Sequence, residues 1–195
     1  MDSQSLDLDE ITEHLRTAHQ AGQDVARLCS GDPSIYSALA EQTRRLDRLG
    51  VPWDVTPGVP AYAAAAALVG RELTVPEVAQ SVVLTRVSGA STAMPETEAL
   101  ARFAATRATL VLHLAIRRTR VLCAELAEEY GADCPVVVVS RASQPEQLVL
   151  RGTLADMADQ VEAAGLRQAA VILVGEALRA EEFVESHLYG PRARP

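Results

Sequence analysis

Short apolar runs alternate with helical patterns along the first part of this chain, and that alternation limits the folds open to it. The apolar runs at 25–29 and 53–56 have the length of strands, and helices are predicted around them at 8–21, 33–49 and 61–68. Strands that alternate with helices favour a parallel sheet with helical crossovers. We therefore predict an N-terminal α/β domain over residues 1–82.

The rest of the chain follows a different pattern. Further strands are predicted at 82–87, 109–116, 135–140, 147–151 and 169–175. Only a short turn joins 135–140 to 147–151, and a connection of that length requires an antiparallel pair. The sequence therefore predicts a mixed sheet in a C-terminal α/β domain over 83–188. The Pro- and Arg-rich segment 189–195 is expected to be a flexible tail.

Charge and cysteine content exclude several classes of protein. The chain has 195 residues and a net charge of −8, which argues against a nucleic-acid partner held by bulk charge. Cys29, Cys123 and Cys134 lack metal-ligand spacing, so we predict no metal site, and the apolar patterns around Cys29 and Cys123 predict burial. No apolar run reaches the ~18 residues of a membrane helix. We expect a cytoplasmic protein with reduced thiols and no membrane partner.

A tight polar turn, Ser30-Gly31-Asp32-Pro33-Ser34-Ile35-Tyr36, follows the first predicted strand. Asp32 suits a helix N-cap and Pro33 suits the first helical position. In open α/β sheets, ligands bind beyond the carboxyl ends of strands, so this turn is a candidate binding site. A purely structural reading, with Asp32 acting only as a cap, stays open.

A second turn, Pro57-Gly58-Val59-Pro60, follows the second predicted strand. It leads into the helix predicted at 61–68, which has almost no side-chain bulk. Small residues would let the backbone of this helix lie close to a ligand. Close packing against a sheet explains them equally well.

These two turns resemble motifs of the tetrapyrrole methylases, which use S-adenosylmethionine. Within that family, the members that methylate precorrin-4 at C11 are the most similar, on the segments Gly70–Pro76, Val82–Arg86, Met94–Glu96 and Val136–Ser143. The resemblance implies two α/β domains of the tetrapyrrole methylase type. The family opens with a strand and a Gly-rich loop that precede these motifs, so we expect the parallel sheet of the first domain to lack both.

The resemblance also implies a reaction and a cofactor site. A methyl group would pass from S-adenosylmethionine to C11 of precorrin-4, or of its cobalt form, in cobalamin synthesis. When the family's motif positions are matched residue by residue to this sequence, the resemblance implies the following cofactor-binding residues: Asp32, Ile35, Pro60, Ala61, Leu114, Ala142 and Ala170. Ile35, Leu114 and Ala170 lie on apolar patterns, so a role in the core is an alternative. The motifs identify no catalytic residue.

The implied substrate carries acetate and propionate groups, which suit the planar guanidinium of arginine. Arg86, Arg117 and Arg141 each lie close to the end of a predicted strand and are the candidate substrate-binding residues. Arg118 and Arg120 belong to the same charged run as Arg117, which is also typical of a solvated first turn of a helix.

Two alternatives to this function stay open. A chain without the first strand and loop could be an inactive fragment, or the methyl group could go to another precorrin position. In either case we expect a homodimer, because an exposed sheet edge promotes self-association.

Overall fold

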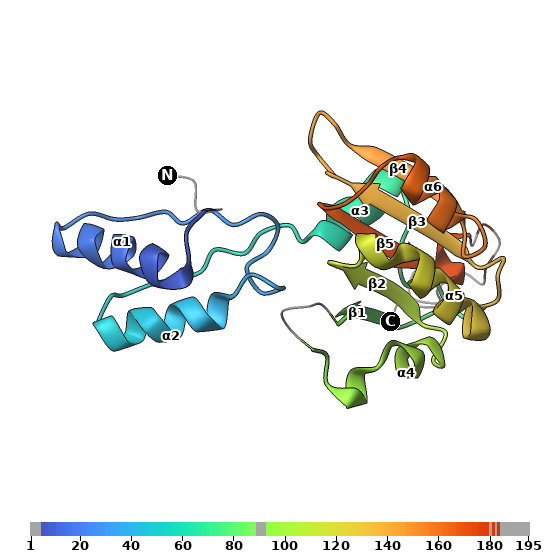
Figure 1. Cartoon of the computed structure of the whole chain (residues 1–195), viewed down its shortest axis with the longest axis horizontal. Coiled ribbons are helices and arrows are strands. Elements are labelled where there is room, and N and C mark those ends of the chain that lie inside the picture. Colours follow the sequence, from blue (N-terminus) through green and yellow to red (C-terminus); the bar gives the residue numbers. More distant parts are fainter. Residues whose placement is uncertain (1–4, 89–92, 180, 182, 184–195) are drawn as a thin grey trace, which may run out of the picture. The chain divides into compact units, whose positions relative to one another are not determined.

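The computed structural model describes residues 5–88, 93–179, 181 and 183, and Figure 1 shows the whole chain. By its contacts the chain divides into two compact units, residues 1–60 and 61–195. The domain boundary expected at residue 82 stays a prediction. The expected tail at 189–195 lies outside the described residues.

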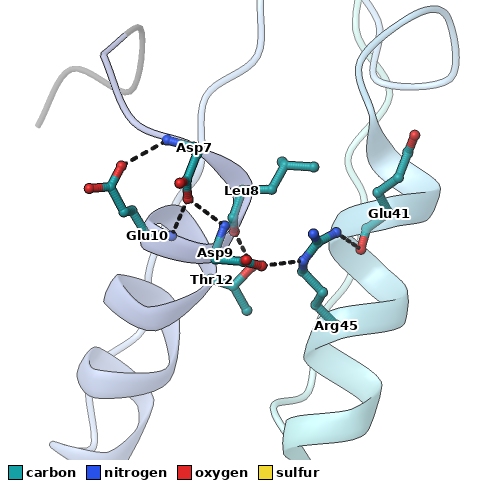
Figure 2. A network of polar contacts seen from close by, with 7 residues as sticks. All are labelled: Asp7, Leu8, Asp9, Glu10, Thr12, Glu41 and Arg45. Carbon is teal, nitrogen blue, oxygen red and sulfur yellow. Dashed lines mark hydrogen bonds and ion pairs between the residues drawn. The ribbon is translucent and has the colours of Figure 1, made fainter.

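Two helices form the regular part of the first unit, α1 (Leu8–Gln20) and α2 (Leu39–Leu49). A capping box begins α1: the Asp7 carboxylate accepts hydrogen bonds from the backbone N–H groups of Asp9 and Glu10, at 2.9 and 2.8 Å. The Glu10 carboxylate in turn accepts from the Asp7 N–H at 2.9 Å (Figure 2). These contacts satisfy N–H groups that the first turn leaves free, which explains where α1 begins.

An ion pair joins the two helices. The Nε of Arg45 on α2 donates to the Asp9 carboxylate on α1 at 2.9 Å, as Figure 2 shows. The same guanidinium donates to the Glu41 carbonyl one turn earlier in α2, at 3.3 Å. The sequence predicted α1 correctly, but it did not predict this contact.

Helix α2 begins six residues later than predicted. Tyr36 and Ala38 have left-handed backbone conformations, with φ of 53° and 57°, which a right-handed helix cannot contain. The segment from Pro33 to Ala38 is therefore a series of turns, and Ala38 precedes the first residue of α2. Asp32 does not cap this helix.

The two strands predicted for the first unit are not formed. Residues 25–29 and 53–56 have no strand assignment, and within the described part of this unit no sheet is present. A strand requires a hydrogen-bonded neighbour, and neither segment has one there. Cys29, predicted to be buried, is accordingly exposed, whereas Cys123 and Cys134 of the second unit are buried.

The second unit contains a five-stranded mixed sheet, in agreement with the predicted α/β class. Its strands are β1 (Val82–Arg86), β2 (Thr109–His113), β3 (Pro135–Ser140), β4 (Leu148–Thr153) and β5 (Ala170–Val174), in the order β1-β2-β5-β3-β4. β1 and β2 are parallel, and β5 is antiparallel to both β2 and β3. The hairpin predicted from the short connection is confirmed as the antiparallel pair β3–β4.

Alternate residues of the central strands enter two separate cores. Leu112, Val138 and Ile172 belong to a core that includes residues of α4 (Leu100–Ala104), α5 (Thr119–Tyr130) and α6 (Met157–Ala163). Val137 and Leu173 belong to the second core, which includes α3 (Ala61–Val69) (Figure 1). A sheet covered on both faces explains why these strands read as continuous apolar runs.

Short helical turns and one tight turn connect these elements. A 3-10 turn, Glu96–Glu98, precedes α4, and two more lie at Ile116–Arg118 and Glu176–Leu178. Between α3 and β1, a tight turn is closed by a bridge between Val75 and Ala79. Among the described residues, no helix has both the length and the apolar character needed to cross a membrane.

We expect Asp7→Ala to destabilise the first unit by about 1 kcal/mol, because the variant loses the N-cap of α1. Urea denaturation followed by circular dichroism measures the change. Asp24→Ala is the control, since it removes the same group from an exposed position outside any helix. Equal stabilities of the two variants would contradict the capping role.

Candidate functional site

Most of the predicted binding residues of the second unit lie at one end of its strands. β1, β2 and β3 point the same way, so their carboxyl ends meet the start of β5 at one edge of the sheet, here called the carboxyl edge. Ser140 of β3 pairs with Ala170 of β5, and Leu112 of β2 pairs with Ile172. The carboxyl edge thereby holds six predicted residues: Arg86, Leu114, Arg117, Arg141, Ala142 and Ala170.

The backbone at the carboxyl edge is unusual. Leu114, Arg141, Ser143 and Ala169 all have left-handed conformations, with φ of 55°, 49°, 67° and 53°. Such conformations are uncommon outside glycine, and they cluster at sites where surrounding structure holds a strained backbone in place. Leu114 follows β2 directly and is 74% exposed, so this apolar side chain is presented at the edge and does not join the core.

Hydrogen bonds hold these turns in place. The backbone N–H of Arg141 donates to the Ala169 carbonyl at 2.8 Å, which ties the end of β3 to the start of β5. The Ser140 hydroxyl donates to the same carbonyl at 3.4 Å. The N–H of Gln144 donates to the Arg141 carbonyl at 3.0 Å and closes the turn that contains Ala142. These bonds compensate for part of the cost of the left-handed residues.

The three arginines predicted to bind substrate have different partners. Arg117 donates through Nε to the Arg167 carbonyl at 2.9 Å, and Arg86 donates through Nη2 to the Ala93 carbonyl at 3.2 Å. Arg141 lies 3.8 Å from the Glu146 carboxylate, beyond hydrogen-bonding distance. Arg117 and Arg86 thus donate to backbone carbonyls, whereas the exposed guanidinium of Arg141 lies beside a carboxylate.

The other two arginines of the charged run are engaged elsewhere. Arg118 donates to the Ser88 carbonyl at 2.8 Å. Arg120 pairs with Asp159 and Glu162, at 2.5 and 2.8 Å, and these carboxylates raise the pKa of its guanidinium. Arg120 thus links α5 to α6.

In the first unit, Asp32 joins the two predicted turns. Its carboxylate accepts a hydrogen bond from the Gly58 N–H at 2.8 Å, and others from the Ser34 N–H, also at 2.8 Å, and the Ser34 hydroxyl. These donors lower the pKa of Asp32, with the Ser34 hydroxyl as the largest cause. A Cβ added at Gly58 would collide with the Gly31 carbonyl oxygen, so the backbones of the two turns are in direct contact.

A groove of about 800 Å³ opens beside these turns, within the first unit. Gly31, Pro33 and Gly58 contribute to its wall, together with Leu28 and Trp53. Leu28 is 88% exposed and Trp53 is 46% exposed, which is unusual for apolar side chains of this size. Asp32 and Ile35 are part of the same turn but do not line the groove.

The predicted residues therefore form two sets, one in each unit. Asp32, Ile35 and Pro60 belong to the first unit, and Ala61, at the start of α3, belongs to the second. Sequence reasoning missed Ser143 and Ala169, whose importance lies in backbone conformation. A left-handed alanine or serine has no sequence signal, unlike the Pro-Gly pair that indicated the turn at Gly58. Among the described residues, no three His, Cys, Asp or Glu side chains cluster as metal ligands would.

Comparison with known proteins identifies the family. The model of the tetrapyrrole (corrin/porphyrin) methylases matches residues 2–158. The chain belongs to the tetrapyrrole methylase family. Among curated members, a precorrin-4 C(11)-methyltransferase of Rhodococcus erythropolis is 58% identical over 97% of this chain and 76% of its own length.

Solved structures of tetrapyrrole methylases have the same fold. A cobalt precorrin-4 methyltransferase, described as a cobalamin biosynthetic enzyme, superposes with a TM-score of 0.87 at 36% identity, over 91% of this chain and 74% of that one. The uroporphyrin-III C-methyl transferase of Thermus thermophilus, solved with S-adenosyl homocysteine, gives a TM-score of 0.71 at 28% identity. That match covers 88% of this chain and 74% of the Thermus protein.

We expect Gly58→Ala to destabilise the first unit by roughly 1–3 kcal/mol, because the new methyl group must displace the Gly31 carbonyl. Chemical denaturation measures the loss. Gly22→Ala is the control: its Cβ meets nothing within 4 Å, and only its φ of 71° is unfavourable. A smaller loss at Gly58 than at Gly22 would contradict the contact between the two turns.

We expect the contribution of Asp32 to stability to depend on pH. Because its pKa is lowered in the folded protein, the stabilisation is present above the ordinary aspartate range of about pH 4 and is lost as the pH falls through the lower, folded value. Asp32→Asn, which places an amide N–H₂ among N–H donors, should therefore be less stable than the parent at pH 7. The difference should shrink toward pH 3. Denaturation curves at both pH values test this, and a pH-independent difference would contradict it.

Proposed function

We propose that this chain methylates precorrin-4 at C11, with S-adenosylmethionine as methyl donor, in the biosynthesis of cobalamin. The observation that carries the proposal is the 58% identity with the Rhodococcus precorrin-4 C(11)-methyltransferase across 97% of the chain. Another precorrin-4 C(11)-methyltransferase, from Pseudomonas aeruginosa, is 53% identical over 94% of the chain. Methylation of another precorrin position has no comparable support.

The carboxyl edge fits a ligand such as S-adenosylmethionine. Leu114 offers an exposed apolar surface there, and Ala142 and Ala170 are too small to obstruct it. The left-handed turns at Leu114, Arg141 and Ala169 present backbone groups at fixed positions. In the first unit, Asp32 holds the turn at Gly31 against Gly58. We propose Asp32, Ile35, Pro60, Ala61, Leu114, Ala142 and Ala170 as the cofactor-binding residues.

When bound, the sulfonium of the cofactor supplies a methyl group that is already activated for displacement. The protein then needs no nucleophile of its own, and its contribution is to orient the reacting groups and to exclude water. The exposed apolar side chain of Leu114 can shield the reacting groups from water. The hydrogen-bonded turns can hold those groups in a fixed orientation. His113, beside Leu114 at the end of β2, has a pKa that burial lowers, so burial disfavours its positively charged form.

Arginines at the carboxyl edge suit the carboxylates of a precorrin. We propose Arg86, Arg117 and Arg141 for this role, because each lies where a strand of the sheet ends or just beyond it. The net charge of −8 would repel a polycarboxylate substrate from most of the surface. Local positive charge at this edge therefore becomes necessary for binding.

We also propose that the enzyme is a cytoplasmic homodimer. Its three cysteines are free in the structure, as is usual for proteins of a reducing compartment. β1 and β4 are the outer strands of the sheet and leave edge groups available for pairing with a second copy. Analytical ultracentrifugation tests the dimer, and a monomer at micromolar concentration would contradict it.

Incubation of the purified chain with precorrin-4 and S-adenosylmethionine tests the activity. We expect one methyl group to be added per macrocycle, with equimolar S-adenosylhomocysteine, and NMR of the product to place the methyl at C11. Cobalt-precorrin-4 is assayed in parallel, because a structural neighbour carries that name. Addition at another carbon would overturn the proposed position. Absence of turnover with both substrates, from a chain that unfolds cooperatively, would overturn the activity.

We expect Arg141→Gln to raise the KM for the precorrin roughly 5- to 10-fold, because it removes a charged donor from the carboxyl edge. The binding of S-adenosylhomocysteine, measured by calorimetry, should change little. Arg102→Gln is the matched control: Arg102 is an exposed arginine on α4, which precedes β2 and so lies away from the carboxyl edge. Equal KM values for the two variants would contradict a role for Arg141 in substrate binding.

A further inference from the structure

The loop that joins β3 to β4 carries one basic and one acidic side chain. Ser140 and Leu148 form the last pair of this hairpin, so residues 141–147 make up the loop, at the carboxyl edge (Figure 1). Arg141 is its one cation and Glu146 its one carboxylate. The Glu146 carboxylate lies 3.8 Å from Nη1 of Arg141. An arginine proposed to bind carboxylates of the substrate therefore has a carboxylate of its own chain beside it.

The backbone of this loop is fixed, whereas the two charged side chains are partly free. The N–H of Arg141 donates to the Ala169 carbonyl at 2.8 Å. The N–H of Gln147 donates to the Gln144 carbonyl at 3.0 Å, and Glu146 lies within this turn. The side chain of Arg141 is 43% exposed and that of Glu146 is 65% exposed. A change of partner at Arg141 therefore requires only the rotation of side chains.

The partner of Arg141 differs in charge from the partners of the other two arginines proposed to bind substrate. Arg86 and Arg117 donate to backbone carbonyls, which are neutral and leave the positive charge of each guanidinium uncompensated. The carboxylate of Glu146 instead offsets the charge of Arg141. An approaching anion therefore meets the full charge of Arg141 only after Glu146 has moved away.

We propose that Glu146 is a specificity-determining residue, whose carboxylate occupies the place beside Arg141 that a carboxylate of the substrate takes on binding. The inference rests on the proposed function, because it requires Arg141 to bind substrate. A substrate carboxylate displaces the Glu146 side chain, which turns toward solvent, and no covalent bond changes. A macrocycle with uncharged side groups cannot replace the ionic interaction, so it leaves the Arg141–Glu146 pair intact.

The exposure of the pair sets the size of the effect. An ion pair between solvent-exposed side chains shifts an equilibrium by at most about fivefold. A separation of 3.8 Å adds no hydrogen bond to it. A carboxylate that forms two parallel hydrogen bonds with a guanidinium is held more strongly. The exchange therefore favours the substrate, and competition from Glu146 reduces its affinity by a small factor.

Titration of the full chain with uroporphyrin III, a fluorescent macrocycle that carries acetate and propionate groups, tests the inference. The dissociation constant is measured without S-adenosylmethionine for the parent, Glu146→Gln, Arg141→Gln and the double variant. Glu128→Gln is the matched control, because it removes the same charge from an exposed position in the last turn of α5, which leads to the opposite end of β3. The control measures the effect of overall charge.

We expect Glu146→Gln to lower the dissociation constant of uroporphyrin roughly two- to fivefold relative to Glu128→Gln. In the Arg141→Gln background the two substitutions should have the same effect. An equal gain from Glu146→Gln in both backgrounds would overturn the inference, because it would show a general effect of charge. An unchanged or raised dissociation constant in the parent background would also overturn it, as would a parent chain that does not bind uroporphyrin.

The methylation assay separates this inference from the proposed function. Glu146→Gln should lower the KM for the precorrin by the same factor and leave kcat unchanged. If the variants bind uroporphyrin as expected but the parent does not methylate precorrin-4, the proposed reaction fails and the role of Glu146 stands. If the parent methylates precorrin-4 but Glu146→Gln behaves like Glu128→Gln, the inference alone fails.

Discussion

The second unit depends on one backbone arrangement, the insertion of β5 between β2 and β3. β5 runs against both neighbours, so its first residue, Ala170, lies beside the last residue of β3 and near the end of β2. Each central strand is then hydrogen bonded on both sides and buried on both faces, which gives the sheet its stability. The same arrangement brings Leu114, Arg141 and Ala169 to one edge, although they are far apart in the sequence.

Much of this fold could be predicted from the sequence. The Val-rich run at 135–140 and the short connection after it required the β3–β4 hairpin, and the five strands of the second unit all lie where apolar patterns placed them. Prediction from apolar residues succeeded here because strands that are buried on both faces of a sheet appear in the sequence as continuous apolar runs. It failed at 25–29 and 53–56, where the residues have the composition of strands but no partner to pair with in the described unit.

The candidate site was predicted in part, by resemblance and not by periodicity. The turns at Asp32 and Gly58 could be predicted because Asp, Pro and Gly have strong local preferences for turns. The hydrogen bond between Asp32 and Gly58 explains why the two motifs occur together in the family. For Leu114, the resemblance and the apolar pattern gave different predictions. Its place in an apolar run suggested burial, but a left-handed backbone directs it out of the sheet at the end of β2. That conformation results from tertiary structure, which no single-sequence pattern records.

The contact between Gly31 and Gly58 has a consequence for the order of folding. The Asp32–Gly58 hydrogen bond closes a loop of 26 residues, a short separation that costs little chain entropy. The pairing of Leu112 with Ile172, in contrast, must bring together parts of the chain on either side of β3, β4 and two helices. Short-range contacts generally form faster than long-range ones. The turns of the first unit can therefore be assembled while the sheet is still forming, so that one part of the proposed cofactor site is in place before the carboxyl edge exists.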